Sequence, residues 1–315
     1  NRPDRLNSKT VTRILDAADR LGYSPNPLAR ALLAKSTGVI GILTPQTLPS
    51  IFKNPFFAAF HEGVGRACEE HCLSLMIVSP ASRSLSEASA HAPVDGLIVV
   101  GLSESHPEIE LLRRRQMQFV IVDGDAETVP SVNVDDYHGA RQAANLLLER
   151  DHRRIACLTF EQDLSSSHGK KVYGVGRRRL EGYKHSFNDY DILWDDSVLV
   201  PTAASIDAGA AAFKQLWKNP KNRPTAVLAV ADVMAIGMLE EANARGVCVP
   251  DDLAIIGFDD IPQAQWTRPP LTTVRQPMVE KGEIAVQMLL TLIAGEPLTD
   301  RHVLLPTELV IRKSA

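Results

Sequence analysis

The sequence lacks long hydrophobic runs. Its longest apolar stretches, such as Leu97–Val100 and Val227–Val230, have the length of a β-strand. A bilayer span takes about 20 apolar residues, so these stretches are far too short to cross a membrane. The start of the chain is basic and is followed by a polar helix, which is unlike a secretory signal. These absences predict a cytoplasmic protein with no membrane partner.

Cysteine is also scarce. The four cysteines, Cys68, Cys72, Cys157 and Cys248, show no spacing typical of a disulfide framework or a zinc site. Cys68 and Cys72 flank His71, which invites a metal interpretation. Small residues at a helix end and a strand start explain the same three positions and are the favoured interpretation. We therefore expect no metal site and no cofactor.

The motifs of common nucleotide-binding and hydrolytic enzymes are missing. The glycines between Gly174 and Gly182 do not fit GxGxxG, and neither GxxxxGK[ST] nor GxSxG occurs. The acidic pairs Asp251–Asp252 and Asp259–Asp260 lie at the boundaries of predicted strands, where turn and capping roles account for them. The sequence predicts that the protein is not an enzyme.

The charge is distributed unevenly. The whole chain carries a net charge of −4, but residues 1–36 hold seven Lys and Arg against three Asp, a net +4, which leaves −8 for the rest. A basic arm on an acidic body places a polyanionic partner, if there is one, at the N-terminal end. A solvated charged surface is the alternative interpretation of the same charges.

Two helices are predicted near the N-terminus. From Ser8 to Leu21 the apolar residues recur every three or four positions, as on one face of a helix, and Gly22 is suited to end it. A second, short helix is predicted over Asn26–Ala34, with Asn26 as its cap and proline at the first helical position. Because helices shorter than about twelve residues are marginal in water, this second helix should form only when docked.

After Ser36, apolar runs with the length of a strand alternate with amphipathic helical stretches. Regular alternation of this kind predicts parallel sheets covered by helices on both faces. On the order of ten strands over 315 residues is too many for one domain of ordinary size, so two doubly wound lobes are predicted. In such sheets the ligand site lies at the carboxyl ends of the strands, so the two lobes should form a cleft lined by those ends.

The segment Ser8–Leu43, SKTVTRILDAADRLGYSPNPLARALLAKSTGVIGIL, resembles the end of the headpiece, the hinge helix and the first core strand of the LacI/GalR family of bacterial transcription regulators. The resemblance covers nearly the whole remaining chain. It is carried by NPFF (54–57), VDGLIV (94–99), HRRIACL (152–158), RRRLEGY (177–183), ADVMAIGML (231–239), VPDDLAIIGFDDI (249–261) and PPLTTVRQP (269–277).

The resemblance implies an α/β fold of two doubly wound parallel-sheet lobes of the periplasmic-binding-protein type I, preceded by a partial helical headpiece and the hinge helix. Residues 1–36 correspond to that headpiece and hinge. Residues 37–135 and 274–302 correspond to the N-terminal lobe, and residues 136–273 and 303–315 to the C-terminal lobe.

The resemblance also implies a DNA partner. It places Asn26, Ala29, Arg30 and Leu32 against DNA. Leu32 matches the apolar wedge that enters the minor groove and bends the duplex, and Arg30 and the turn at Asn26 would contact phosphates. The helices that read operator bases in this family precede residue 1, so base-specific contacts are not assigned, and operator binding is expected to need those helices.

Arg179 and Asp259 are the principal candidates for effector contacts. The resemblance places Arg179 at a position that reaches into the cleft, where its guanidinium offers a fixed fork of donors to ligand hydroxyls or a carboxylate. Asp259 ends the strand of IIGFD and so points into the same cleft. A salt bridge between Arg179 and an aspartate, with a purely structural role, is the alternative.

Four further residues complete the predicted effector site. Asp123 ends the apolar run VIVD, and Gln276 follows the strand of LTTVR. Phe56 and Phe57 begin a helix that faces the cleft, where one ring is expected to cover the effector and the other to be buried in the core. The expected effector is a small sugar or a nucleobase-like metabolite.

The sequence departs from the family pattern at two places in the first lobe. The loop Pro45–Lys53 is longer than usual, and Ser79–Pro93 is shorter, which predicts a reduced or missing helix there.

The predicted function is a homodimeric, ligand-responsive DNA-binding regulator, interpreted as a repressor, in which effector binding shifts the lobes and the pairing of the hinge helices. A solute-binding protein of a transport system shares the two-lobed core and is the alternative. It would carry a secretion signal and no hinge, whereas this sequence shows the reverse.

Overall fold

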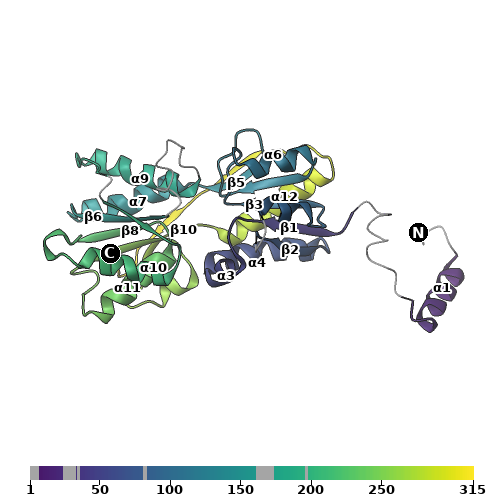
Figure 1. Cartoon of the computed structure of the whole chain (residues 1–315), viewed down its shortest axis with the longest axis horizontal. Helices are drawn as coiled ribbons and strands as arrows, with labels where there is room; N and C mark the ends of the chain where they lie inside the picture. The colour runs from purple at the N-terminus through teal and green to yellow at the C-terminus, as the bar shows by residue number, and fades with distance from the viewer. Residues whose placement is uncertain (1–6, 24–32, 34–35, 81–83, 161–173, 196–197) are drawn as a thin grey trace.

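The structure is a computed structural model that describes residues 7–23, 33, 36–80, 84–160, 174–195 and 198–315. Figure 1 shows two lobes side by side, with an N-terminal helix standing apart from both. Each lobe is built on a six-stranded sheet. The two predicted doubly wound lobes are therefore confirmed.

The first lobe has six parallel strands in the order β11-β5-β4-β3-β1-β2. The strands are β1 (Val39–Leu43), β2 (Ser74–Val78), β3 (Gly96–Val100), β4 (Gln118–Val122), β5 (Ser131–Val134) and β11 (His302–Leu305). Its helices are α3 (Leu48–Lys53), α4 (Pro55–Glu70), α5 (Leu85–Ala90), α6 (Pro107–Arg114) and α12 (Met278–Ile293). The short α5 is the reduced helix expected from the short segment Ser79–Pro93, and α3 lies in the lengthened loop.

Helices cover both faces of this first sheet. In β3, Ile98 and Val100 point into a core cluster shared with α4 and α12. Leu97 and Val99 point the other way, into a cluster shared with α5 and α6. All five residues of β3 are buried, because a central parallel strand has helices on both of its sides.

The second lobe has strands in the order β12-β10-β9-β8-β6-β7, all parallel except the edge strand β12. The strands are β6 (Ile155–Phe160), β7 (Leu199–Thr202), β8 (Ala226–Ala229), β9 (Ala254–Asp259), β10 (Thr272–Arg275) and β12 (Glu308–Val310). The helices are α7 (Asp136–Glu149), α9 (Val175–Asp189), α10 (Ile206–Trp217) and α11 (Asp232–Ala244), with short turns η3 (Pro220–Asn222) and η4 (Pro262–Gln265). Figure 1 shows α7 and α9 on one side of the sheet and α10 and α11 on the other.

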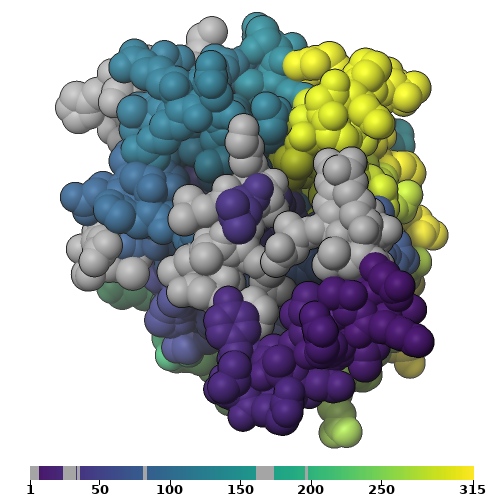
Figure 2. All heavy atoms as spheres, turned by 90° about the vertical axis from the view of Figure 1, so that its right-hand side faces the viewer, coloured from purple at the N-terminus to yellow at the C-terminus, as the bar shows by residue number. Residues whose placement is uncertain are grey.

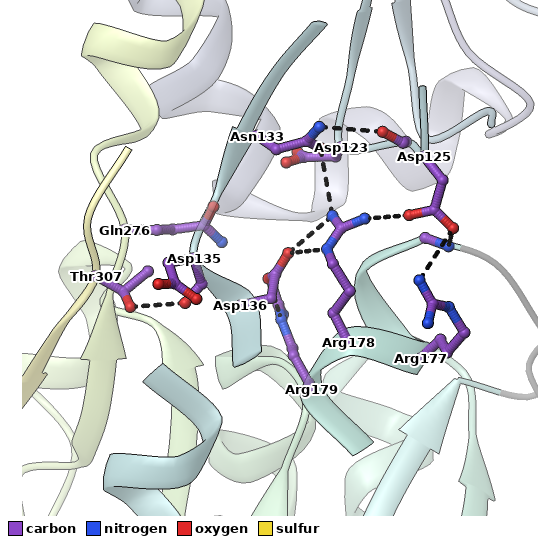
Figure 3. Close-up of polar contacts among 12 residues, drawn as sticks. Asp123, Asp125, Asn133, Asp135, Asp136, Arg177, Arg178, Arg179, Gln276 and Thr307 are labelled. Carbon is purple, nitrogen blue, oxygen red and sulfur yellow. Dashed lines mark hydrogen bonds and ion pairs between the residues drawn. The ribbon is translucent and has the colours of Figure 1, made fainter. Parts of the chain in front are cut away.

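The chain passes between the lobes three times, after β5, β10 and β11. The crossings after β5 and β11 are joined by two hydrogen bonds. The Asp135 N–H donates to the Leu305 carbonyl at 2.9 Å, and the Thr307 hydroxyl donates to the Asp135 carbonyl at 2.9 Å, the latter bond being drawn in Figure 3. The predicted lobe boundaries at 274 and 303 fall inside β10 and β11. The structure places β10 wholly in the second sheet and β11 wholly in the first, because the chain crosses only after each strand has ended.

The N-terminal helix α1 (Ser8–Arg20) is capped by the Asn7 side chain, and Gly22 follows it with a positive φ of 61°, as predicted. It buries none of its residues, and Ile14 and Leu15 on its apolar face are 52% and 60% exposed. Figure 2 looks at this end of the molecule, where α1, in dark purple, lies in front of the first lobe. The predicted hinge helix over 26–34 falls, apart from residue 33, outside the described residues.

Helices α4 and α12 approach each other closely through glycine. A Cβ atom at Gly63 would lie 1.9 Å from the Val279 carbonyl oxygen of α12, whereas a Cβ at Gly65, on the same helix α4, would meet nothing within 4 Å. Gly63→Ala is therefore expected to lower the free energy of unfolding by about 1–3 kcal/mol through overpacking. Gly65→Ala is the matched control and should raise stability by up to ~1 kcal/mol through helix propensity. Urea denaturation of both variants tests this, and equal effects would contradict the close packing.

Candidate functional site

The carboxyl ends of β4 and β9 carry the two aspartates predicted for the cleft. Asp123 follows β4 and Asp259 ends β9, and they are only 8% and 4% exposed. Both have positive φ values, 56° for Asp123 and 131° for Asp259. Residues other than glycine seldom adopt positive φ, although aspartate does so more often than most. The two lobes thus present aspartates of the same unusual backbone conformation at the ends of equivalent strands.

A buried lysine connects Asp123 to the second lobe. Lys281, in α12, has no exposed surface, and its Nζ atom donates to Asp123 Oδ1 at 2.7 Å and to Oδ2 at 2.9 Å. The same Nζ donates to Gln276 Oε1 at 2.7 Å. The Gln276 amide in turn donates from Nε2 to Asp259 Oδ1 at 2.6 Å. An uninterrupted buried hydrogen-bonded chain therefore runs from the first sheet to the second.

Arg179 lies at the far end of this chain. Its Nη1 atom is 3.8 Å from Asp259 Oδ1, and its Nε atom donates to Asp136 Oδ1 at 2.8 Å. Its guanidinium carbon lies 3.6 Å from the centre of the Phe258 ring, and the residue is 3% exposed. Burial alone would lower the pKa of Arg179, but Asp136 and Asp259 outweigh it and raise that pKa. Arg179 is therefore a permanent buried cation.

Arg178 links the lobes at a second point, shown in Figure 3. Its Nη1 atom donates to Asp125 Oδ1, in the loop after β4 of the first lobe, at 2.5 Å. Its Nε atom donates to Asp136 Oδ2 at 3.0 Å, and Nη2 donates to Asn133 Oδ1 at 3.3 Å. Asp136 is thus shared by two neighbouring arginines of α9, one facing each lobe.

Asp232 lies beneath Asp259 and is fully buried at the start of α11. It accepts hydrogen bonds from the Ile261 N–H at 3.0 Å and the Thr273 hydroxyl at 2.5 Å. Burial raises the pKa of Asp232, and the nearby charge of Asp259 raises it further. Burial also raises the pKa of Asp259, although Arg179 opposes that shift. The two carboxyls therefore form a pair that holds on to protons above the ordinary carboxyl range.

This pair predicts a pH dependence of stability. With raised pKa values, the folded protein binds protons that the unfolded chain releases above an ordinary aspartate pKa of 3.8. By linkage, the pair's contribution to the free energy of unfolding falls as pH rises from that value through the raised pKa values. Asp259→Asn removes one of the two titrating carboxyls and with it part of this decrease in the free energy of unfolding. The stability of the variant relative to the parent should therefore increase with pH. Urea denaturation across a pH series checks this, and a difference that stays constant or decreases would be contrary to it.

The structure brings five of the six predicted effector residues into one cluster. Asp123, Gln276, Asp259 and Arg179 are linked as described, and the ring of Phe56 lies 5.1 Å from Lys281 Nζ. The sixth, Phe57, packs against the first-lobe core, but Phe56 packs against the second-lobe core in the same way and both residues are partly buried, so the expected division into one core ring and one effector-covering ring stays a prediction. The predicted DNA contacts Asn26, Ala29, Arg30 and Leu32 lie outside the described residues.

The cluster also contains four residues that the sequence analysis missed: Asp125, Asp136, Arg178 and Lys281. The sequence could have indicated Arg178, because it adjoins Arg179 in the run RRR. Two neighbouring arginines at the start of a helix can both reach one carboxylate. Lys281 had no such signal. A single lysine within an amphipathic helix is ordinarily a surface residue.

No group of His, Cys, Asp and Glu in the described part of the chain is arranged to hold a metal ion. Cys68 is buried and Cys72 is exposed, and neither forms a disulfide. Within the same residues, no helix is long and apolar enough to cross a membrane.

Comparison with known proteins agrees with this architecture. A family model described as a periplasmic binding protein-like domain matches residues 144–315. An HTH-type transcriptional regulator of Mycolicibacterium smegmatis is 33% identical over 311 residues, which cover 92% of this chain and 84% of the relative. The transcriptional repressor CytR of Escherichia coli is 29% identical over 320 residues, which cover 99% of this chain and 89% of the repressor.

Solved structures give the same result. A structure of the transcriptional regulator CelR in complex with cellobiose superposes with a TM-score of 0.78 at 27% identity, covering 99% of this chain and 92% of the other. A LacI family regulatory protein from Chloroflexus aggregans superposes with a TM-score of 0.72 at 28% identity, covering 88% of this chain and 98% of the other. Together with the two-lobed fold and the buried polar cluster between the lobes, these likenesses show that the chain belongs to the LacI/GalR family of ligand-responsive, DNA-binding transcriptional regulators.

Proposed function

We propose that the cleft binds a small uncharged sugar or nucleobase-like metabolite through Phe56, Asp123, Arg179, Asp259 and Gln276. The observation that carries this proposal is the buried polar cluster at the strand ends where the lobes meet. Ligand hydroxyls both donate and accept hydrogen bonds, so they can exchange with the carboxylates, amide and guanidinium of this cluster. The relative solved with cellobiose supports a sugar-like effector.

A melting-temperature screen against sugars and nucleosides tests the proposal. A ligand that binds only the folded protein raises Tm in proportion to the logarithm of its concentration once the site is saturated. We expect at least one uncharged sugar or nucleoside to do so. A screen in which only charged amines or no compounds raise Tm would speak against the proposed effector class.

Effector binding is proposed to act by changing how the lobes sit against each other. The ion pair between Asp125 and Arg178 and the hydrogen-bonded chain through Gln276 are two of the polar links between the lobes, and a ligand inserted among them alters both. The changed lobe arrangement would be transmitted to the hinge. The hinge residues proposed to contact DNA remain Asn26, Ala29, Arg30 and Leu32. The named relatives are regulators, and no catalytic role is proposed.

The protein is further proposed to be a homodimer with its lobes side by side. Trp266, after the η4 turn, is 74% exposed, and aromatic residues such as tryptophan are enriched at protein interfaces relative to the rest of the surface. Sedimentation should give a dimer of the 34.5 kDa chain at about micromolar concentration. Trp266→Ala is expected to weaken dimerisation by roughly tenfold or more, as for an interface hot spot.

The control for the dimer is Leu193→Ala, because Leu193 is even more exposed, at 91%, but lies in the turn after α9. This change should leave sedimentation unaltered. A monomer at micromolar concentration, or equal effects of the two substitutions, would contradict the proposed interface.

A further inference from the structure

Lys281 is a buried cation whose role the proposed effector site does not explain. It lies in α12, and it contacts three of the proposed effector residues: Asp123, Gln276 and Phe56. The close packing of α12 on α4 holds it there. A Cβ atom at the adjacent Gly282 would lie 2.5 Å from the Phe60 carbonyl oxygen, so the backbone of Lys281 has little room to shift toward α4.

The three partners of the Lys281 ammonium form a complete set for binding such a group. An ammonium has three N–H donors, and three acceptor atoms lie within 2.7–2.9 Å of this one: the two carboxylate oxygens of Asp123 and the amide oxygen of Gln276. The ring of Phe56, at 5.1 Å, adds an aromatic face. A carboxylate, a carbonyl and an aromatic ring together make an ammonium subsite, and the protein's own side chain fills it.

We propose that Lys281 is a specificity-determining residue, because its ammonium permanently occupies an ammonium subsite within the effector cleft. This inference rests on the proposed function, since the subsite shares Asp123, Gln276 and Phe56 with it. The consequence is that the cleft rejects effectors carrying an amine at this position. A second ammonium would compete with the Lys281 ammonium for the same acceptor atoms and would lie beside a like charge. Uncharged ligands with hydroxyl groups meet no such repulsion.

Removing the lysine side chain should open the subsite to an external amine. In Lys281→Ala, the Asp123 carboxylate, the Gln276 carbonyl and the Phe56 ring remain, and the space of the three lost carbons and the ammonium nitrogen is left beside them. The probe is n-propylammonium chloride, which approximates the missing atoms. Its neutral counterpart is n-propanol with sodium chloride at the same ionic strength.

We expect n-propylammonium to raise the Tm of Lys281→Ala in a saturable manner by on the order of a few degrees. The propanol control should not do so. The parent should not respond, because its subsite is full. Lys214→Ala, which removes an exposed lysine of α10, should also not respond. Adding Asp123→Asn to Lys281→Ala should abolish the effect, because the subsite then lacks its charge.

An equal rise with propanol would reveal a merely apolar cavity and overturn the proposal, as would the same rise in the parent or no rise in Lys281→Ala. If Lys281→Ala does not fold unaided, the refolding yield replaces Tm as the readout. Recovery with propylammonium alone supports the proposal, and equal yields with both compounds overturn it. The probe needs no effector, so failure of this assay and failure of the effector screen are separate results.

Discussion

Arg179→Ala is expected to lower the free energy of unfolding by about 3–5 kcal/mol, the cost of breaking a buried ion pair by removing one partner. Asp136, which is fully buried, would lose one of its two guanidinium contacts, and Asp259 would lose its neighbouring cation. The backbone carbonyl of Val230 would lose its donor as well. Urea denaturation of the variant measures the effect.

The matched control is Arg66→Ala. Arg66 pairs with Glu62 on the surface of α4 at 2.5 Å, but its side chain is 59% exposed. Exposed pairs of this kind contribute about 0–1 kcal/mol, so the change should be small. Similar decreases in the free energy of unfolding for Arg179→Ala and Arg66→Ala would contradict a stabilising role for the buried ion pairs of Arg179.

Asp259→Asn is expected to weaken effector binding by on the order of thirty- to a thousandfold, corresponding to the loss of about 2–4 kcal/mol from a charge-assisted contact. Asparagine keeps an oxygen to accept from Gln276 and tolerates the positive φ of this position, so the fold should be preserved. Asp259→Asn therefore distinguishes a role in effector binding from a purely structural role better than Arg179→Ala does, because Arg179→Ala removes a cation that stabilises the fold.

Calorimetric titration with an effector identified by the melting-temperature screen measures this change. An affinity for Asp259→Asn within about threefold of the parent would remove Asp259 from the site. A variant that loses binding yet keeps the parent's stability without ligand would establish a direct contact.

The strand ends were predictable from the sequence because an apolar run that stops at an aspartate marks the carboxyl end of a parallel strand. That pattern located Asp123 and Asp259 at the carboxyl ends of β4 and β9, as the structure shows. The family resemblance added Arg179, and the structure shows it paired with aspartates, which is the structural alternative weighed for it, whereas its contact with an effector stays a prediction. Its nearer carboxylate is Asp136, at 2.8 Å, and Asp259 is 3.8 Å away.

Other features could not be read from the sequence because they depend on packing. Asp135 and Asp136 are neighbours of the same type, yet Asp135 caps α7 through the His138 N–H, and Asp136 is buried between two arginines. Only the approach of α9 to α7 assigns these roles. Lys281 is similar, because its burial follows from where α12 crosses the sheet and not from its neighbours in the chain.

The measurement that tests the account most directly is operator binding by the protein carrying a complete helix-turn-helix, titrated by fluorescence anisotropy with and without the effector. The parent and Asp259→Asn are compared at the same salt concentration, because phosphate contacts make affinity depend on salt. We expect the effector to change the operator affinity of the parent and to leave that of Asp259→Asn nearly unchanged. An effector that binds the parent's cleft without altering its operator affinity would contradict this expectation.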